Sequence, residues 1–107
     1  MGDRISIQFI NGDNKSVVLF AHHYGKDLLE SAKHFIAKIE EDDDSKDFPL
    51  GRLEVNSVMF YFCSYICSAN SYITDGNYYL GKDSEDGDNS DNGHYIFNLK
   101  TKTIKRG

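Results

Sequence analysis

The first part of the chain has the pattern of a β-hairpin. From Arg4 to Ile10 every second residue is apolar, which predicts a strand with one buried face. The segment 11–14 contains Asn-Gly, and both residues tolerate the positive φ of a tight turn, so the chain is expected to reverse there. The return strand, 16–22, carries the nearly continuous apolar run Val17–Phe20, which is typical of a central strand covered on both faces.

An amphipathic helix is predicted next, over 26–41. Its apolar residues recur at the spacing of one helix face, while the charged residues between them fall on the opposite face. The apolar positions are Leu28, Leu29, Ala32, Phe35, Ile36 and Ile39. The acidic segment 42–50 contains Pro49 and reads as a loop.

The segment 57–68 supports two interpretations. The β-branched and aromatic run Val58–Phe62 favours a strand. Asn56 or Ser57 as an N-cap, together with a run too long for an average strand, favours a helix, and a buried helix is our prediction. The aromatic stretch Val58–Tyr65 also leaves open an alternative role as a homodimer interface.

Three further strands are expected near the C-terminus. A short strand over 77–81 and a strand over 94–99 are predicted to form a hairpin across a long polar insert, and 103–105 is predicted to form a last strand. The element order is then ββααβββ. This order predicts one α+β domain, residues 1–107, with two helices on one face of an antiparallel sheet.

The polar insert, 82–94, has the most distinctive composition in the chain. It holds five carboxylates, two Asn, two Gly and a His, with no apolar residue before Tyr95. Such a loop lies on the surface, and at this length it is usually either functional or disordered. We take it as the candidate binding surface, with these residues: Asp83, Glu85, Asp86, Asp88, Asn89, Asp91, Asn92 and His94.

The charge distribution indicates what such a surface could bind. The formal net charge is −5, but 40–47 and 82–91 together carry −9, so the remainder of the chain is +4. Acidic patches repel nucleic acid and suit a cation or a basic protein surface, including one that normally binds nucleic acid. The predicted partner is therefore a protein. Direct nucleic-acid binding is not expected, because the four basic residues of 100–106 are a weak footprint.

A cation site is the alternative interpretation of the insert. Asp88–Gly93 places oxygen ligands at positions 1, 3 and 5 and Gly at position 6, as a calcium loop does, but position 12 is Leu99 instead of a bidentate Glu. This excludes an EF-hand and leaves a simpler Ca²⁺ loop. Histidines would add a transition-metal or hydrolytic acid–base site. The candidate ligands are Asp86, Asp88, Asp91, His94, His22 and His23.

Other classes of function have little support in the sequence. There is no Gly-x-Ser-x-Gly elbow and no Gly-rich phosphate loop, and Cys63 and Cys67 lie in an apolar run that disfavours reactive thiolates. No certain cofactor is implied. No apolar run approaches the roughly 18 residues of a membrane span, and no export signal is recognised, so a cytoplasmic location is expected.

One resemblance adds to this interpretation. Leu80–Asp83, followed by Asp86–Tyr95, resembles a motif of small uncharacterised prokaryotic and phage-type proteins, and the hairpin leading into His22, His23 and Gly25 is similar in placement. The resemblance implies occurrence in bacteria, archaea and their mobile elements, where genes of this kind include inhibitors of host defence systems. It supplies no catalytic residue. The resulting hypothesis is a non-enzymatic binding or inhibitor protein that acts through the acidic loop.

Overall fold

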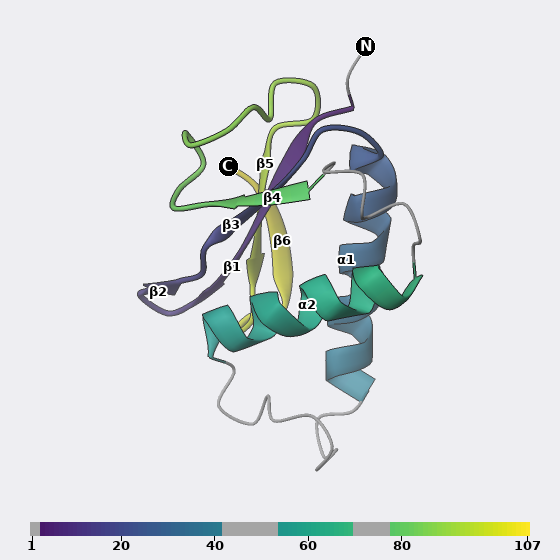
Figure 1. Cartoon of the computed structure of the whole chain (residues 1–107). Coiled ribbons are helices and arrows are strands. Elements are labelled where there is room, and N and C mark those ends of the chain that lie inside the picture. The colour runs from purple at the N-terminus through teal and green to yellow at the C-terminus, as the bar shows by residue number, and fades with distance from the viewer. Residues whose placement is uncertain (1–2, 42–53, 70–77) are drawn as a thin grey trace.

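The computed structural model describes residues 3–41, 54–69 and 78–107. The predicted loop 42–50 lies outside these residues, as does most of the acidic segment 40–47. Figure 1 shows a sheet with two helices, α1 (Gly25–Glu41) and α2 (Val55–Ala69). The strands are β1 (Ile5–Asn11), β2 (Asn14–Lys15), β3 (Val18–Ala21), β4 (Tyr78–Gly81), β5 (His94–Asn98) and β6 (Thr103–Arg106).

The α+β class and both helices are confirmed, and the element order is βββααβββ instead of ββααβββ. The additional element arises because the return strand of the hairpin is divided at Ser16. There, the Ser16 hydroxyl accepts a hydrogen bond from the Phe9 main-chain N–H at 3.0 Å, and the Ser16 carbonyl accepts one from the Gln8 side chain. The Ser16 N–H still donates to the Phe9 carbonyl at 2.9 Å, but the Phe9 N–H is bound by the Ser16 hydroxyl instead of a main-chain carbonyl, so the ladder is irregular at this point. The reversal itself occurs where predicted, with Gly12 at φ +63°.

The sheet is mixed, so the prediction of a purely antiparallel sheet is wrong. Its order is β4-β3-β1-β5-β6, and β5 runs parallel to β1. The predicted hairpin between 77–81 and 94–99 is also wrong, because β4 pairs with β3 while β5 pairs with β1. The segment after β4 must cross two strands, about 14 Å at the usual strand spacing. Its length allows that crossing, and no local pattern of residues indicated it.

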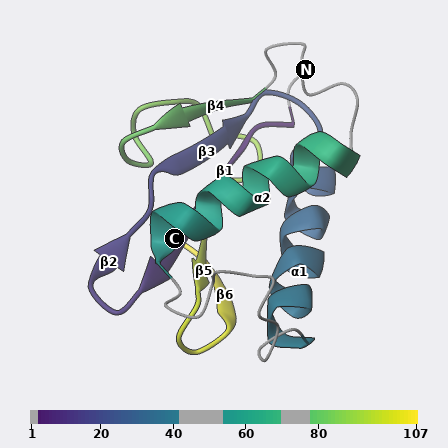
Figure 2. The same ribbon diagram turned by 60° about the horizontal axis from the view of Figure 1, so that its bottom comes forward.

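The segment 57–68 is helical, as predicted, within α2. Its Val58, Phe62 and Ile66 are buried against the sheet. Figure 2 shows α2 lying across the strands with α1 beside it, so that both helices cover the same face of the sheet. Among the described residues, neither helix is long and apolar enough to cross a membrane.

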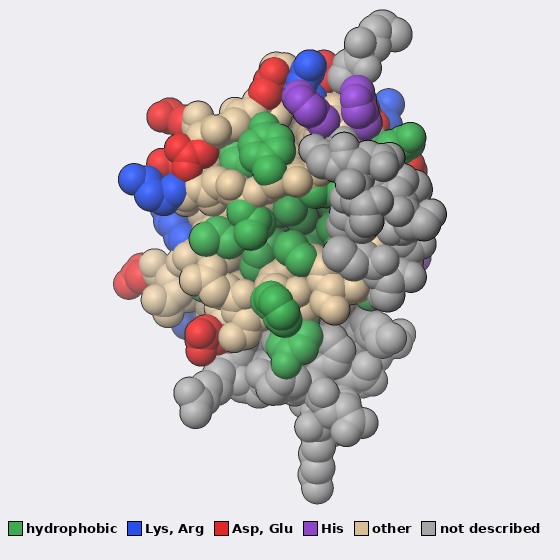
Figure 3. Space-filling view, viewed as in Figure 1, with side chains coloured by type: hydrophobic (Ala, Val, Ile, Leu, Met, Phe, Trp, Pro, Cys, Tyr) green, Lys and Arg blue, Asp and Glu red, His purple; other side chains and the backbone are tan. Residues whose placement is uncertain are grey.

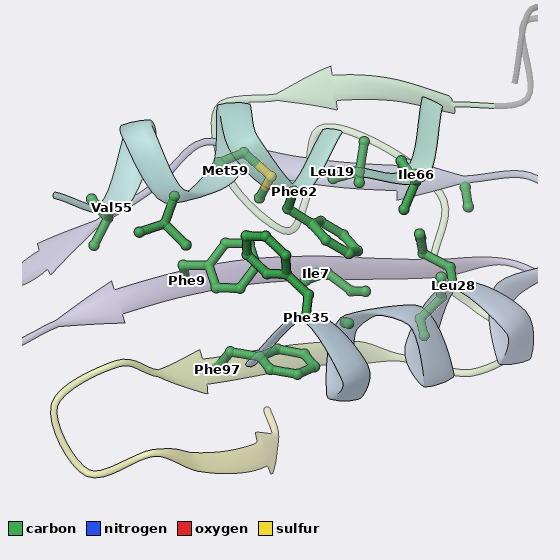
Figure 4. Close-up of a cluster of buried hydrophobic side chains, with 14 of the residues drawn as sticks. Ile7, Phe9, Leu19, Leu28, Phe35, Val55, Met59, Phe62, Ile66 and Phe97 are labelled. Atoms are coloured by element: carbon green, nitrogen blue, oxygen red, sulfur yellow. The ribbon is translucent and has the colours of Figure 1, made fainter. Parts of the chain in front are cut away.

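The core is an aromatic cluster between the helices and this face of the sheet. The Phe9 ring of β1 lies 6.2 Å from Phe35 of α1, 5.7 Å from Phe62 of α2 and 5.7 Å from Phe97 of β5, measured between ring centroids (Figure 4). Phe9 therefore joins four elements. Burial of rings of this size supplies much of the hydrophobic free energy of a small domain.

Candidate functional site

Residues 82–93, called the insert below, form a loop that joins β4 to β5 (Figure 1). His94, the last residue of the predicted loop 82–94, is the first residue of β5. The insert packs on the sheet face opposite the helices, called the back face below. Its hydrogen bonds and close contacts involve Ser6 and Phe20, which are paired in register and lie outside the helix-side core.

One row of side chains across the back face carries the insert. The sheet register places Tyr79, Phe20, Ser6 and His94 side by side on β4, β3, β1 and β5. The Phe20 ring is fully buried and stacks on Tyr79 with centroids 5.0 Å apart and planes at 8°. Gly87 lies against this pair: a Cβ there would be 2.5 Å from the Tyr79 hydroxyl oxygen and 2.8 Å from the Phe20 ring. The absence of a side chain at 87 therefore lets the insert cover Phe20.

A chain of hydrogen bonds continues from the insert into the back face. Asn89 Nδ2 donates to Ser6 Oγ at 2.8 Å, and Ser6 Oγ lies 2.7 Å from His94 Nδ1. His94 Nε2 lies 3.2 Å from Gln8 Oε1, and Gln8 Nε2 donates to the Ser16 carbonyl at 2.9 Å. Because the Gln8 amide presents its oxygen to His94, Nε2 carries the imidazole proton, and Nδ1 accepts from the Ser6 hydroxyl. With a neutral imidazole, every donor in this series of hydrogen bonds meets an acceptor.

His94 is buried, and its pKa is lowered from 6.5 by desolvation. The arrangement of its neighbours acts in the same direction. A protonated Nδ1 would be a donor, so the Ser6 hydroxyl would receive hydrogen bonds from both Nδ1 and Asn89 and would lose the acceptor for its own proton. The imidazole is therefore held as a neutral structural group.

Arg4 holds the second half of the insert. Its Nε lies 3.3 Å from Asp88 Oδ2, and its Nη1 lies 3.3 Å from Asp91 Oδ2. The main-chain N–H of Arg4 also donates to Asp91 Oδ2 at 3.0 Å. The pKa of Asp88 is lowered from 3.8, first by hydrogen bonds from the side chain and main chain of Ser90, then by the nearby charges of Arg4 and His22. A guanidinium thus supplies positive charge beside two of the predicted binding carboxylates.

The end of the insert meets the N-terminus of α1. Asn92 Nδ2 donates to Asp3 Oδ1 and to the Arg4 carbonyl, while Asp3 Oδ2 accepts from the Lys26 main-chain N–H at 3.2 Å. Asp3 therefore caps the N-terminus of α1, where the partial positive charge of the helix dipole favours a carboxylate. Its pKa is lowered from 3.8, chiefly by the Asn92 hydrogen bond. Gly25 permits this approach, since a Cβ there would overlap the Asp3 carbonyl oxygen and crowd Asn92.

The first half of the insert folds on itself and remains exposed. The Asp86 carboxylate accepts from the main-chain N–H groups of Lys82 and Asp83, and Asp83 Oδ1 accepts from the Glu85 N–H at 2.9 Å. The Asp83–Glu85 bond forms an Asx turn, and the Asp86 carboxylate closes the segment by binding main-chain N–H groups three and four residues before it. The side chains of Asp83, Glu85 and Asp86 are exposed, and acidic side chains appear on the surface of Figure 3 in the region where Figure 1 draws the insert.

The structure does not gather the candidate metal ligands into one group. His94 directs both ring nitrogens to Ser6 and Gln8, whereas His22 and His23 are exposed after β3, with ring centroids 5.8 Å apart. His22 is close enough to Asp88 to affect the pKa of that carboxyl. Within the described ranges, no group of three or more His, Cys, Asp or Glu residues is placed to hold a metal ion. Calcium or transition-metal binding stays a prediction.

The sequence interpretation missed the residues that receive the insert. Ser6 and Gln8 alternate with the apolar residues of β1, so they were expected on an exposed face, but both are buried, Ser6 against Asn89 of the insert and Gln8 beside His94. Arg4 was treated only as the start of the strand. A strand whose polar face carries small or amide side chains, together with a long Asx-rich loop elsewhere in the chain, is compatible with such a cover, but a solvent-exposed strand face has the same pattern.

Comparison with protein-family models, curated proteins and solved structures finds no match to this chain.

Proposed function

We propose that this protein is a non-enzymatic binding protein that attaches to a basic surface of a partner protein through the exposed first half of the insert. The observation that carries the proposal is the combination of exposed carboxylates with a fixed loop. Asp83, Glu85 and Asp86 face solvent in successive turns, while Asn89 and the Arg4 ion pairs attach the rest of the insert to the sheet.

The physical reason is preorganisation. A flexible acidic tail loses conformational freedom when it binds, whereas a loop already fixed by hydrogen bonds loses less. Fixed carboxylates also steer a basic partner and set its orientation. The resemblance of the insert to a prokaryotic and phage-type motif supports an inhibitor of a host defence system as the biological setting, with the basic, nucleic-acid-binding surface of a defence protein as the partner.

The test compares two variants of equal charge. Asp83→Asn with Glu85→Gln removes two charges from the insert and keeps an oxygen at Asp83 to accept the Glu85 N–H bond. Asp13→Asn with Glu54→Gln removes two charges at exposed positions in the β1–β2 turn and before α2. Proteins captured by the wild-type chain from a prokaryotic extract would be purified and titrated calorimetrically with all three forms.

The expected result is a stoichiometric complex, weakened by added salt and by the insert variant, and unchanged by the control variant. Each lost charge contact should cost about 0.2–1 kcal/mol, as for exposed ion pairs. Equal affinity of both variants for every captured protein would contradict the proposal, because the insert would then be a covering loop only.

A further inference from the structure

The sheet ends in two edges of opposite character. Within the described residues, β4 is paired only with β3 and β6 only with β5. Unpaired edges are templates for another strand, and proteins commonly protect them with charged residues. The β4 edge over 79–81 contains no charged residue, and Leu80 is 58% exposed on it. The β6 edge, Thr103–Arg106, contains two basic residues and Ile104, 40% exposed.

The charge around the two edges is complementary. The insert that follows β4 carries five acids and one Lys, a net −4. The turn before β6 and β6 itself, 100–106, carry three Lys and one Arg and no acid, a net +4. These opposite charges favour contact between unlike edges, since contact between two β6 edges would bring the basic segments together.

The strand directions place these charges opposite one another. β4 is antiparallel to β3, β3 is antiparallel to β1, β1 is parallel to β5, and β5 is antiparallel to β6. β4 and β6 therefore run in opposite directions. When the sheet of a second copy continues the first, its β6 meets β4 in the antiparallel sense. The residues just after β4, including Asp83 and Glu85, then lie beside those just before β6, Lys100 and Lys102.

The apolar side chains of the two edges also fall on one face. Leu80 is in register with Leu19, and Ile104 is in register with Phe97; both partners belong to the helix-side core. In a continuous sheet, Leu80 and Ile104 of the next copy lie on the same face, where cross-strand apolar pairs stabilise the ladder. Figure 3 shows hydrophobic side chains gathered on the surface around β4 and α2.

We propose that β4 is a docking edge for the β6 strand of a second copy of this chain. The contact is heterologous, so each copy offers one donor edge and one acceptor edge, and assembly continues beyond two copies unless a ring closes. This inference goes beyond the proposed function. Self-association needs no other protein. It can therefore be absent while a basic partner still binds, and partner binding can be absent while the chain still self-associates.

The first measurement is sedimentation velocity of the purified chain over a range of concentrations at about 20 mM and about 500 mM salt. At low salt the weight-average mass should rise beyond that of a dimer, and high salt should weaken association on the order of tenfold or more. A monomer at every concentration would overturn the proposal. A mass that stops at two copies would also overturn it, because an isologous contact would then be present.

A mixing experiment tests the pairing of unlike edges. Leu80→Lys places a charge on the β4 edge and leaves β6 intact, while Lys100→Glu with Lys105→Glu reverses charge at the β6 edge and leaves β4 intact. All three side chains are exposed, so both variants should fold, as checked by circular dichroism. Each alone should be monomeric, and an equimolar mixture should form a one-to-one dimer. A mixture that remains monomeric would refute the heterologous contact.

Two variants control for the charge changes: one makes the same change as Leu80→Lys, and the other makes half the change of Lys100→Glu with Lys105→Glu. Val17→Lys introduces a lysine at an exposed apolar position before β3, and Lys15→Glu reverses a charge on β2, away from both edges. Both should associate as the wild-type chain does. If they lose association to the same extent as the edge variants, net charge and not the β4–β6 contact controls assembly, and the proposal fails.

Discussion

The attachment of the insert to the sheet can be tested at one amide. In Asn89→Ala, the hydrogen bonds from Nδ2 to Ser6 Oγ at 2.8 Å and to the Ser84 carbonyl at 3.2 Å are both lost. A typical intramolecular hydrogen bond contributes about 0.5–1.5 kcal/mol, so the change should cost roughly 1–3 kcal/mol. Asn14→Ala, at an exposed position on β2, is the control and should stay within about 0.5 kcal/mol of wild type.

The assay is equilibrium urea unfolding combined with amide hydrogen exchange. Exchange is informative because the insert can detach without global unfolding. The amides of Asn92 and Gly93 donate to the carbonyls of Arg4 and Asn89 at 2.9 Å and 2.7 Å, so their protection reports directly on the attached loop. Asn89→Ala should reduce the protection of both amides, while amides in the β1–β3 ladder should lose no more than the global change in stability.

A double-mutant cycle decides whether the network acts through Ser6. Ser6→Ala removes the hydroxyl that receives the Asn89 hydrogen bond and leaves His94 Nδ1 without its donor. Because either substitution alone abolishes the Asn89–Ser6 bond, the double variant should be about 0.5–1.5 kcal/mol more stable than the sum of the single effects predicts. Additivity within about 0.3 kcal/mol would refute the reasoning that Asn89 attaches the insert by this route.

Three further changes test other contacts. Gly87→Ala should destabilise the fold by about 1–3 kcal/mol in thermal unfolding, since its Cβ would meet Tyr79 and no space exists to receive it; an unchanged melting temperature would contradict this packing. Asp3→Ala should cost about 0.5–2 kcal/mol through loss of the cap on Lys26, measured by urea unfolding. Because the folded-state pKa of His94 lies below 6.5, the unfolded chain binds a proton first on acidification, so stability should fall as pH drops below 6.5. In His94→Gln, the free energy of unfolding should fall less steeply with decreasing pH. An unaltered pH dependence in that variant would show that groups other than His94 cause the loss of stability.

Local patterns of side chains were sufficient to predict the helices, the strands and the α+β class. Alternation in β1, the helical spacing in α1 and the length of the apolar run in α2 each depend on side chains a few residues apart, so both helices and the strands they accompany were predicted close to their observed bounds. The expected N-cap of α2, Asn56 or Ser57, is wrong, because the helix begins at Val55 and Asn56 Oδ1 accepts a hydrogen bond from the Val17 main-chain N–H at 3.0 Å. The exposed position of Asp83, Glu85 and Asp86 likewise follows from their polarity.

The pairing of the strands and the contacts of the insert depend on the assembled fold. A parallel β1–β5 ladder joins residues nearly ninety positions apart, and no local pattern distinguishes it from the hairpin that was expected between 77–81 and 94–99. That single choice makes the insert cross the back face. It buries Ser6 and His94 and turns Asn89 from a candidate binding residue into one that attaches the loop to the sheet. The physical reason is that a polar face of a strand is compatible with water or with a polar loop, and the chain topology selects between them.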